Sequence, residues 1–271
     1  MPISTLKRSD TVFLAGLALF GGLYLFLIIA MLVADASFTT PSHVWQSLQS
    51  PEIRYSIKLS LISCSVTALL SVWCATAIGY VMSRFDFRGK QLIEAILDIP
   101  IVLPPLVVGL SLLILFQTPP GKFIEHYVPV TYAIPSVILA QFSVACAFAV
   151  RTMRGTFDLI SPRSEQVAMT LGCSRAQAFW IVALPEARHG ILTAATLAWA
   201  RSLGEFGPIL VFSGATRFHT EVLPTTVFLE LSTGNIESAV AVSLLMVAAA
   251  AIVLTLVRVF GGPDAAAGRA I

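Results

Sequence analysis

The chain has 271 residues, of which 56% are hydrophobic and 12% are charged, with a formal net charge of +2. Soluble domains carry about a quarter charged residues, and the apolar residues here form long blocks without alternation or a heptad repeat. The composition therefore excludes a water-soluble enzyme, a disordered chain and a coiled coil. The small net charge gives no basic field for nucleic acid. These properties indicate an integral membrane protein surrounded by lipid.

Six apolar runs are each long enough to cross a bilayer, which takes about 20 predominantly apolar residues. We therefore predict an all-α integral membrane fold of six transmembrane helices, forming a single domain over residues 1–271. The predicted spans, in chain order, are residues 11–34, 59–82, 99–116, 132–150, 190–214 and 238–257. The first run exceeds the apolar core of a signal peptide, so we expect it to be retained as a helix.

Lysine and arginine predict the orientation, because they favour the cytoplasmic side of short loops. With six spans, the N-terminus, the second and fourth loops and the C-terminus share one side. That side holds twelve of these residues against four on the other. We therefore expect both termini in the cytoplasm, where the terminal basic residues are Lys7, Arg8, Arg258 and Arg269.

Prolines interrupt the third and fifth predicted spans, at Pro100, Pro104-Pro105 and Gly207-Pro208. Proline lacks a backbone donor and clashes with the preceding turn, so these helices should be kinked or broken. In a membrane, the freed backbone groups must be satisfied by protein or by a watery cavity. The breaks therefore serve either helix packing or a pathway through the protein.

The fourth loop, residues 151–189, is too polar to span a membrane and shows helix signals. Ser161-Pro162 predicts a helix start, with serine as the N-cap and proline in the first turn. Val167, Ala168 and Leu171 then lie three or four residues apart, which places them in one apolar stripe.

Gly172 is suited to end this first helix, because glycine readily adopts the left-handed conformation. Ser174 and Gln177 have the spacing of a capping box, which would start a second helix. We expect the second helix to end at Pro185. The loop is therefore predicted to form a cytoplasmic helix-turn-helix between the fourth and fifth spans. Its exposed stripe is costly in water unless it meets a partner or folds back on the bundle.

Residues 165–172 (EQVAMTLG) and 182–185 (VALP) resemble the signature loop of binding-protein-dependent ABC importer permeases. The family pattern is E-A-A-x-x-x-G, nine residues, then I-x-L-P. Aligned on Gly172, the spacing is kept, with Gln166 and Val167 in place of Glu and Ala and Val182 in place of Ile. Glu165 stands one place before the acidic position of the family.

In that family the loop forms coupling helices that sit in a groove on a cytosolic ATPase. The resemblance carries this role to six residues: Gln166, Val167, Ala168, Gly172, Leu184 and Pro185. The alternative for the apolar members is packing of the loop against its own bundle.

The resemblance extends to substrate class. Residues 83–90 and 98–105 are similar to the second-loop and third-helix region of oxyanion permeases. Residues 200–207 (ARSLGEFG) are similar to a fifth-helix motif of molybdate, tungstate and sulfate/thiosulfate permeases. The resemblance implies import of molybdate or tungstate, with sulfate or thiosulfate as the next substrates. Permeases for ferric iron, polyamines and thiamine share the loop and remain open.

Active import needs an energy source that this sequence does not provide. A P-loop requires Gly-Lys followed by Ser or Thr, whereas the two Gly-Lys pairs here are followed by Gln91 and Phe123. The resemblance implies that ATP and Mg²⁺ bind a separate cytosolic ABC ATPase dimer. It also implies a second permease copy, an extracytoplasmic solute-binding protein and a prokaryotic cytoplasmic (inner) membrane. We expect no cofactor or metal in this chain, because the histidines lack metal-ligand spacing.

Arg201 and Glu205 form the one opposite-charge pair well inside a predicted span. Their i, i+4 spacing places them on one helix face. They either line a translocation path, with the Ser202 hydroxyl beside them, or form a structural ion pair. On the outer side, Glu221, Glu230 and Glu237 oppose Arg217 in the fifth loop, an acidic edge that would orient the binding protein.

Two other classes of protein compete with the permease. An intramembrane enzyme would need a polar catalytic constellation at membrane depth. The sequence contains neither H-E-x-x-H nor G-x-S-x-G, and it offers a single deep charge pair. A channel that acts without ATP would leave the exposed loop unexplained. We therefore predict a transport subunit that is not itself an enzyme.

Overall fold

The computed structural model describes the backbone of residues 8–260 and the side chains of residues 13–255, and within that part the regular elements are all helices. The predicted all-α class is therefore confirmed. We predicted that both termini lie in the cytoplasm, from Lys7, Arg8, Arg258 and Arg269. These residues or their side chains lie outside the described part. The helices are α1 (Arg8–Phe38), α2 (Pro41–Gln49), α3 (Pro51–Arg84), α4 (Lys90–Val102), α5 (Pro105–Gln117), α6 (Pro119–Tyr127), α7 (Ile134–Leu159), α8 (Pro162–Thr170), α9 (Arg175–Ala178), the π-helix η2 (Phe179–Ala183), α10 (Leu184–Glu186), α11 (Arg188–Leu203), α12 (Gly207–Phe212), α13 (Leu223–Ser232) and α14 (Ile236–Phe260).

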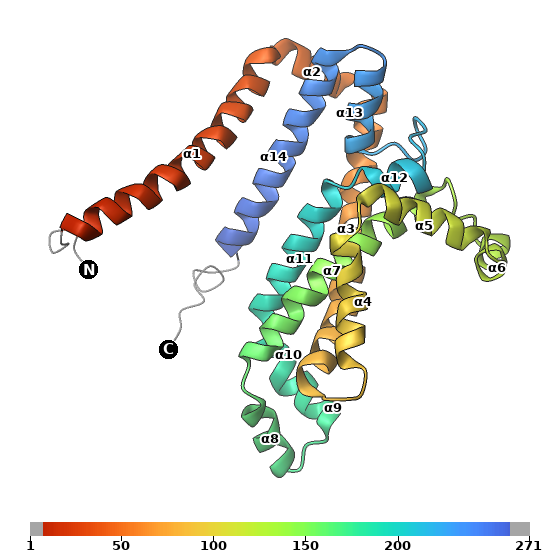
Figure 1. Cartoon of the computed structure of the whole chain (residues 1–271). Coiled ribbons are helices and arrows are strands. Elements are labelled where there is room, and N and C mark those ends of the chain that lie inside the picture. The colour runs from red at the N-terminus through yellow and green to blue at the C-terminus, as the bar shows by residue number, and fades with distance from the viewer. Residues whose placement is uncertain (1–7, 261–271) are drawn as a thin grey trace.

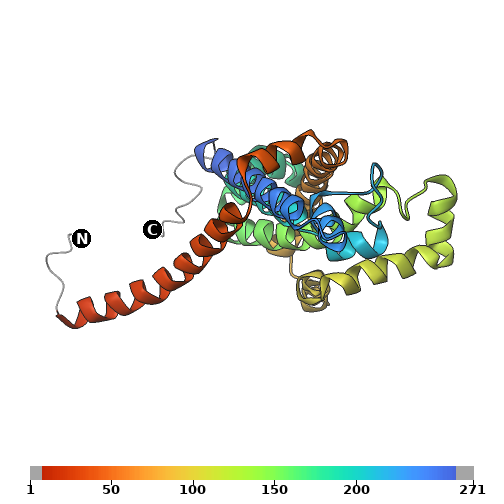
Figure 2. The same ribbon diagram turned by 90° about the horizontal axis from the view of Figure 1, so that it is seen from above.

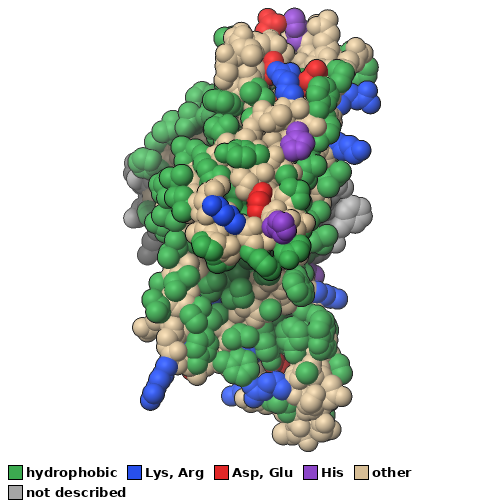
Figure 3. Space-filling model, turned by 90° about the vertical axis from the view of Figure 1, so that its right-hand side faces the viewer, with side chains coloured by type: hydrophobic (Ala, Val, Ile, Leu, Met, Phe, Trp, Pro, Cys, Tyr) green, Lys and Arg blue, Asp and Glu red, His purple; other side chains and the backbone are tan. Residues whose placement is uncertain are grey.

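Four helices, α1, α3, α7 and α14, are long and apolar enough to cross a membrane, and α4 with α5 passes the same test as a pair bent by 113°. The fifth predicted span is the shorter α11, followed by a break and α12. The protein is thus a multi-pass membrane protein, while the count of six spans stays a prediction. Figure 3 shows hydrophobic side chains along much of one face, with a few charged and His side chains among them and Lys and Arg side chains near its upper and lower ends.

The centre of the fold is a bundle of α3, α7 and α11 (Figure 1). Small residues on the buried face of α3 let the neighbouring backbone come close, as in other membrane bundles. A Cβ on Gly79 would lie 2.8 Å from the backbone nitrogen of Arg154 on α7. The C-terminal parts of α3 and α7 are therefore in backbone contact, and α7 continues to Leu159, well beyond residue 150.

Helix α1 extends away from this bundle, on the side opposite the α5–α6 arm (Figure 2). Its membrane-spanning window is 0% buried. Large side chains such as Phe20 and Tyr24 are 76% and 68% exposed. Within one chain, the surroundings of α1 are therefore almost entirely lipid or a further protein.

Prolines break the third and fifth predicted spans, as the sequence indicated. The chain bends between α4 and α5 at Leu103-Pro104, whereas Pro100 lies inside α4. The second break runs from Gly204 to Phe206, between α11 and α12.

The two broken spans meet through glycines. A Cβ on Gly109 of α5 would lie 2.7 Å from the Cα of Pro208, and a Cβ on Gly207 would lie 3.0 Å from the nitrogen of Leu106. Only glycine permits this approach of α5 to α12, because any larger residue would meet backbone atoms.

Candidate functional site

The start, the turn and the capping box of the loop between α7 and α11 fold as the local sequence signals predicted. Ser161 caps α8, with its hydroxyl accepting from the Arg163 nitrogen at 3.4 Å. Gly172 follows α8 with φ +96°, the left-handed conformation. The capping box of the second helix is complete: the Ser174 nitrogen donates to Gln177 Oε1 at 2.7 Å, and the Gln177 nitrogen donates to Ser174 Oγ at 3.3 Å.

The prediction that the second helix ends at Pro185 is wrong. Helix α9 passes into the π-helix η2, and Pro185 lies inside α10, directly before α11. The Leu184 nitrogen donates to the Phe179 carbonyl, five residues back. This wider turn accommodates the proline, whose ring would clash with a carbonyl of a regular α-helix.

The predicted stripe of α8 lies open. Val167 and Leu171 are 57% and 81% exposed; we call these two residues the coupling stripe. Ala168 and Leu184 are partly buried, and Gln166, Gly172 and Pro185 are exposed. The side chains of Val167 and Leu171 therefore do not pack against their own bundle, whereas Ala168, the third residue of the predicted stripe, is partly buried. The loop lies at the end of the molecule opposite α2 and α13 (Figure 1).

Glu165, whose role the sequence left open, is 5% exposed and fixes α8 to the membrane helices. Its Oε1 accepts from Arg84 Nε at 2.7 Å, and its Oε2 accepts from the Tyr80 hydroxyl at 2.7 Å. We call these three residues the Glu165 anchor. A buried, doubly hydrogen-bonded ion pair of this kind specifies a geometry more than it adds net stability.

Arg84 of the Glu165 anchor also closes the end of α7. Its Nη1 donates to the Phe157 carbonyl at 2.7 Å, and its Nη2 donates to the Ile160 carbonyl at 3.0 Å. The last carbonyls of a helix lack partners within the helix, so the guanidinium caps α7 while it holds α8. Tyr80 packs edge-on against Phe157 and Phe179, with ring centroids 5.4 and 4.6 Å apart. One cluster thus joins α3, α7, α8 and η2.

Arg201 and Glu205 are paired at the break of the fifth span. Arg201 Nη2 lies 2.5 Å from Glu205 Oε1, and the side chains are 30% and 1% exposed. The Arg201 guanidinium also lies 5.6 Å from the centroid of the Phe148 ring, a cation–π contact. Ser202 is 0% exposed and its hydroxyl donates to the Ala198 carbonyl at 2.7 Å. In this conformation the Ser202 hydroxyl is therefore used inside the helix, while part of Arg201 stays open.

Sequence reasoning missed Gln141, a buried amide of α7 that contacts the same break. Its Nε2 donates to the Ser202 carbonyl at 3.3 Å. A single polar residue inside an apolar run carried no signal, because the residue that it contacts lies 61 positions away.

The prediction of an exposed acidic edge in the fifth loop is wrong for two of its three acids. Glu221 is 0% exposed, and Glu230 is 7% exposed, bonded to Arg217 at 2.8 Å. Burial raises the pKa of Glu221, more than the Thr226 hydroxyl and the Arg217 guanidinium lower it. Only Glu237 of the three acids is exposed, 3.0 Å from His43 Nδ1.

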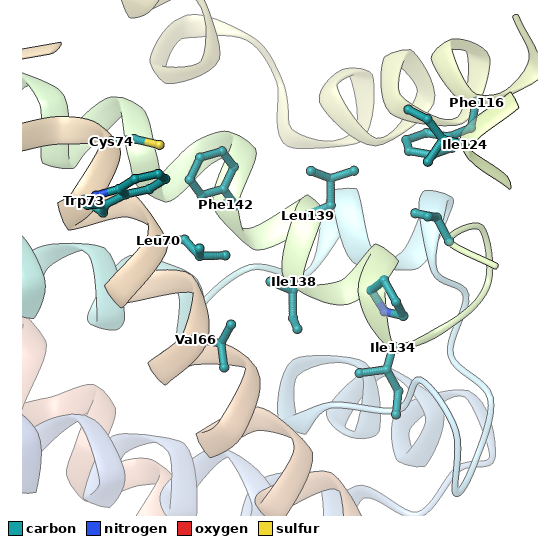
Figure 4. Close-up of a pocket in the computed structure, with 12 residues that line it drawn as sticks. Val66, Leu70, Trp73, Cys74, Phe116, Ile124, Ile134, Ile138, Leu139 and Phe142 are labelled. Atoms are coloured by element: carbon teal, nitrogen blue, oxygen red, sulfur yellow. The ribbon is translucent and has the colours of Figure 1, made fainter. Parts of the chain in front are cut away.

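Two pockets differ in chemistry. A polar pocket of 450 Å³ lies at the end of the molecule that carries α2 and α13. It is lined by residues of α2, α13, α14 and the start of α3, including Glu52, and by Arg217 and Asn235 of the loops before and after α13. A second pocket, of 530 Å³, lies between α3, α7 and the α5–α6 arm (Figure 4). Its lining, including Trp73, Phe116 and Phe142, is apolar and suits hydrocarbon but not an anion.

The helices and the folded loop between α7 and α11 together define a multi-pass, all-α membrane protein with an exposed apolar stripe on that loop. The family described as binding-protein-dependent transport system inner membrane component matches residues 70–261. The chain belongs to this family.

The relatives with assigned names are permease proteins of transport systems. The sulfate transport system permease protein CysT of Salmonella typhimurium is 29% identical over 239 residues, 87% of this chain and 86% of that protein. The molybdate/tungstate transport system permease protein WtpB of Pyrococcus abyssi is 36% identical over 166 residues, 61% of this chain and 63% of that protein. A crystal structure of a bacterial alginate ABC transporter, in complex with an alginate pentasaccharide-bound periplasmic protein, has the same fold. It matches with a TM-score of 0.72 at 16% identity, over 94% of this chain and 93% of that one.

Proposed function

We propose that the chain is the transmembrane permease subunit of an ATP-driven ABC importer that moves an oxyanion into the cytoplasm by alternating access. The observation that carries this proposal is the exposed coupling stripe on a folded loop whose other side the Glu165 anchor fixes to α3 and α7. An apolar surface presented on a fixed support is expected of a docking site.

Molybdate or tungstate is the proposed substrate, with sulfate or thiosulfate second. The named activities of the relatives and residues 200–207 support an oxyanion. The partly open guanidinium of Arg201 provides positive charge at membrane depth. No tight site is needed in this chain, because an extracytoplasmic binding protein would supply most of the selectivity.

The proposed assembly contains two copies of this permease, a cytosolic ABC ATPase dimer that binds ATP and Mg²⁺, and a solute-binding protein. ATP-driven closure of the dimer would draw the two loops together, and the Glu165 anchor would pass that displacement to α3 and α7. The binding protein would dock at the outer end, over the polar pocket beside α2 and α13. Both termini would lie in the cytoplasm.

Purification from its own membranes in mild detergent tests the proposal. We expect a stoichiometric P-loop ATPase to remain bound, as identified by mass spectrometry. Proteoliposomes containing that complex and its binding protein should then take up molybdate or tungstate only with ATP. Recovery of the chain alone, with anion flux that needs no ATP, would favour a channel instead.

Replacing Leu171 by aspartate should remove the bound ATPase, because it places a charge in the centre of the proposed docking surface. The measurement is the amount of ATPase that is retained on the tagged permease. Phe218→Asp is the matched control: Phe218 is 52% exposed and lies in the outer loop before α13. Equal ATPase retention by the two variants would exclude the coupling stripe as the docking surface.

Replacing Gly172 by valine should reduce coupled uptake while the protein stays in the membrane. A side chain at φ +96° costs about 1–2 kcal/mol, and the strain would displace α8 from α9. Gly155→Val is the matched control, since neither glycine has a described atom within 4 Å of an added Cβ and only Gly172 has a positive φ. Uptake per ATP hydrolysed is measured, and wild-type coupling in Gly172→Val would remove this turn from the coupling path.

A further inference from the structure

The break in the fifth span removes the regular helical hydrogen bond of one backbone carbonyl, that of Ser202. In an unbroken α-helix the Ser202 carbonyl would accept from the nitrogen of residue 206. Here it accepts instead from the Glu205 nitrogen at 3.2 Å and from Gln141 Nε2 at 3.3 Å. The Gln141 amide thus supplies a second donor to a carbonyl that has lost its regular helical partner, and this contact stabilises the broken conformation.

Gln141 also connects the break to α3. Its Oε1 accepts from the Thr67 hydroxyl at 3.2 Å, and its Nε2 lies 3.6 Å from Cys64 Sγ. The side chain is 1% exposed, so water does not replace these contacts. A carboxamide provides both the acceptor for α3 and the donor for the break, which no apolar side chain of this length can do.

The same helix carries the contact with the cytoplasmic loop. Gln141 and Phe157 both lie on α7, sixteen residues and about 24 Å apart along the axis. The Phe157 carbonyl is held by Arg84 of the Glu165 anchor. A continuous helix of this length moves as a rigid unit, so a displacement at its cytoplasmic end reaches Gln141.

We propose that Gln141 is a positioning residue through which α7 transmits movement of the cytoplasmic loop to the break that holds Arg201 and Glu205. This proposal rests on the proposed function. Gln141 is bonded to the Ser202 backbone on one side and to the Thr67 side chain of α3 on the other, so it acts by fixing where the Arg201–Glu205 pair lies. Movement of α7 would open or close the break, because Gln141 would pull the Ser202 carbonyl through the hydrogen bond between them.

Gln141→Met tests the proposal in the reconstituted complex of permease, ATPase and binding protein. Methionine has a similar length and no donor. We expect membrane level, retained ATPase and basal ATP hydrolysis to stay as in the wild type. Uptake per ATP hydrolysed should fall about tenfold, because the Ser202 carbonyl keeps its bond from the Glu205 nitrogen but loses the bond that links it to α7. The matched control is Ser143→Ala, also on α7, whose hydroxyl donates only to the Ala140 carbonyl of its own helix.

If the role of Gln141 is purely structural, Gln141→Met should lower the amount of permease in the membrane and its melting temperature, and the ratio of uptake to ATP hydrolysis should not change. This result would overturn the proposal. If Gln141→Met does not accumulate, Thr67→Val decides, because it removes the other half of the bridge with little change of volume. A normal ratio in Thr67→Val would then overturn the proposal. Absence of ATP-driven uptake in the wild-type complex would instead reject the proposed function.

Discussion

Replacement of Glu165 by alanine is expected to abolish coupled uptake and to release α8 from the membrane helices. Arg84 would be left buried, with a side chain only 8% exposed, and breaking such a pair from one side costs about 3–5 kcal/mol. The freed guanidinium would retain the two carbonyls at the end of α7 and the Ser83 hydroxyl, none of which carries a charge. Uptake in proteoliposomes and protease cleavage of residues 161–187 measure the two effects.

Two further variants distinguish the effect of the Glu165 charge from the effect of its hydrogen bonds. Tyr80→Phe removes one hydrogen bond to the same carboxylate and should cost about 1 kcal/mol, with uptake largely kept. The double variant Arg84→Met with Glu165→Met removes both charges and should recover much of the stability. Wild-type uptake in Glu165→Ala would contradict the role of the Glu165 anchor.

Replacement of Arg201 by methionine is expected to produce the second large loss. Glu205, at 1% exposure, would be left as an unpaired carboxylate at membrane depth, again at a cost of about 3–5 kcal/mol. Membrane level should fall, and any protein that folds should lose uptake. Quantitative immunoblotting of membranes and uptake assays provide the measurements.

The double variant Arg201→Met with Glu205→Met distinguishes the two interpretations of this pair. Recovery of both membrane level and uptake would identify a structural ion pair. Recovery of membrane level without uptake would identify Arg201 as a group that attracts the anion. A single variant that folds and transports normally would show that neither interpretation holds.

Local signals predicted the cytoplasmic loop well, because caps and turns depend on neighbouring residues. Ser161, Gly172, Ser174 and Gln177 all adopt the predicted geometry. The one local prediction that is wrong is the helix end at Pro185. A π-helical turn lies before this proline, and its wider spacing lets the helix continue.

The sequence pattern could not predict contacts between residues that lie far apart in the chain. Arg84 and Glu165 are 81 residues apart, and neither position shows which of the other charges it meets. Glu221 looked like a surface acid because loops are usually solvated, yet the return of the chain towards α13 buries it. Hydropathy and the prolines likewise predicted a break in the third span, but not the 113° angle between its two halves.

The isolation of α1 has a consequence for how its sequence can vary. A substitution inside the bundle of α3, α7 and α11 leaves a void or a clash, so neighbouring side chains constrain its shape. In α1, where the spanning window is 0% buried, the same change leaves no void within the chain. Its own fold therefore constrains α1 by length and hydropathy alone. Any position in α1 that tolerates one apolar residue but rejects another of equal hydropathy would mark a contact with a different chain.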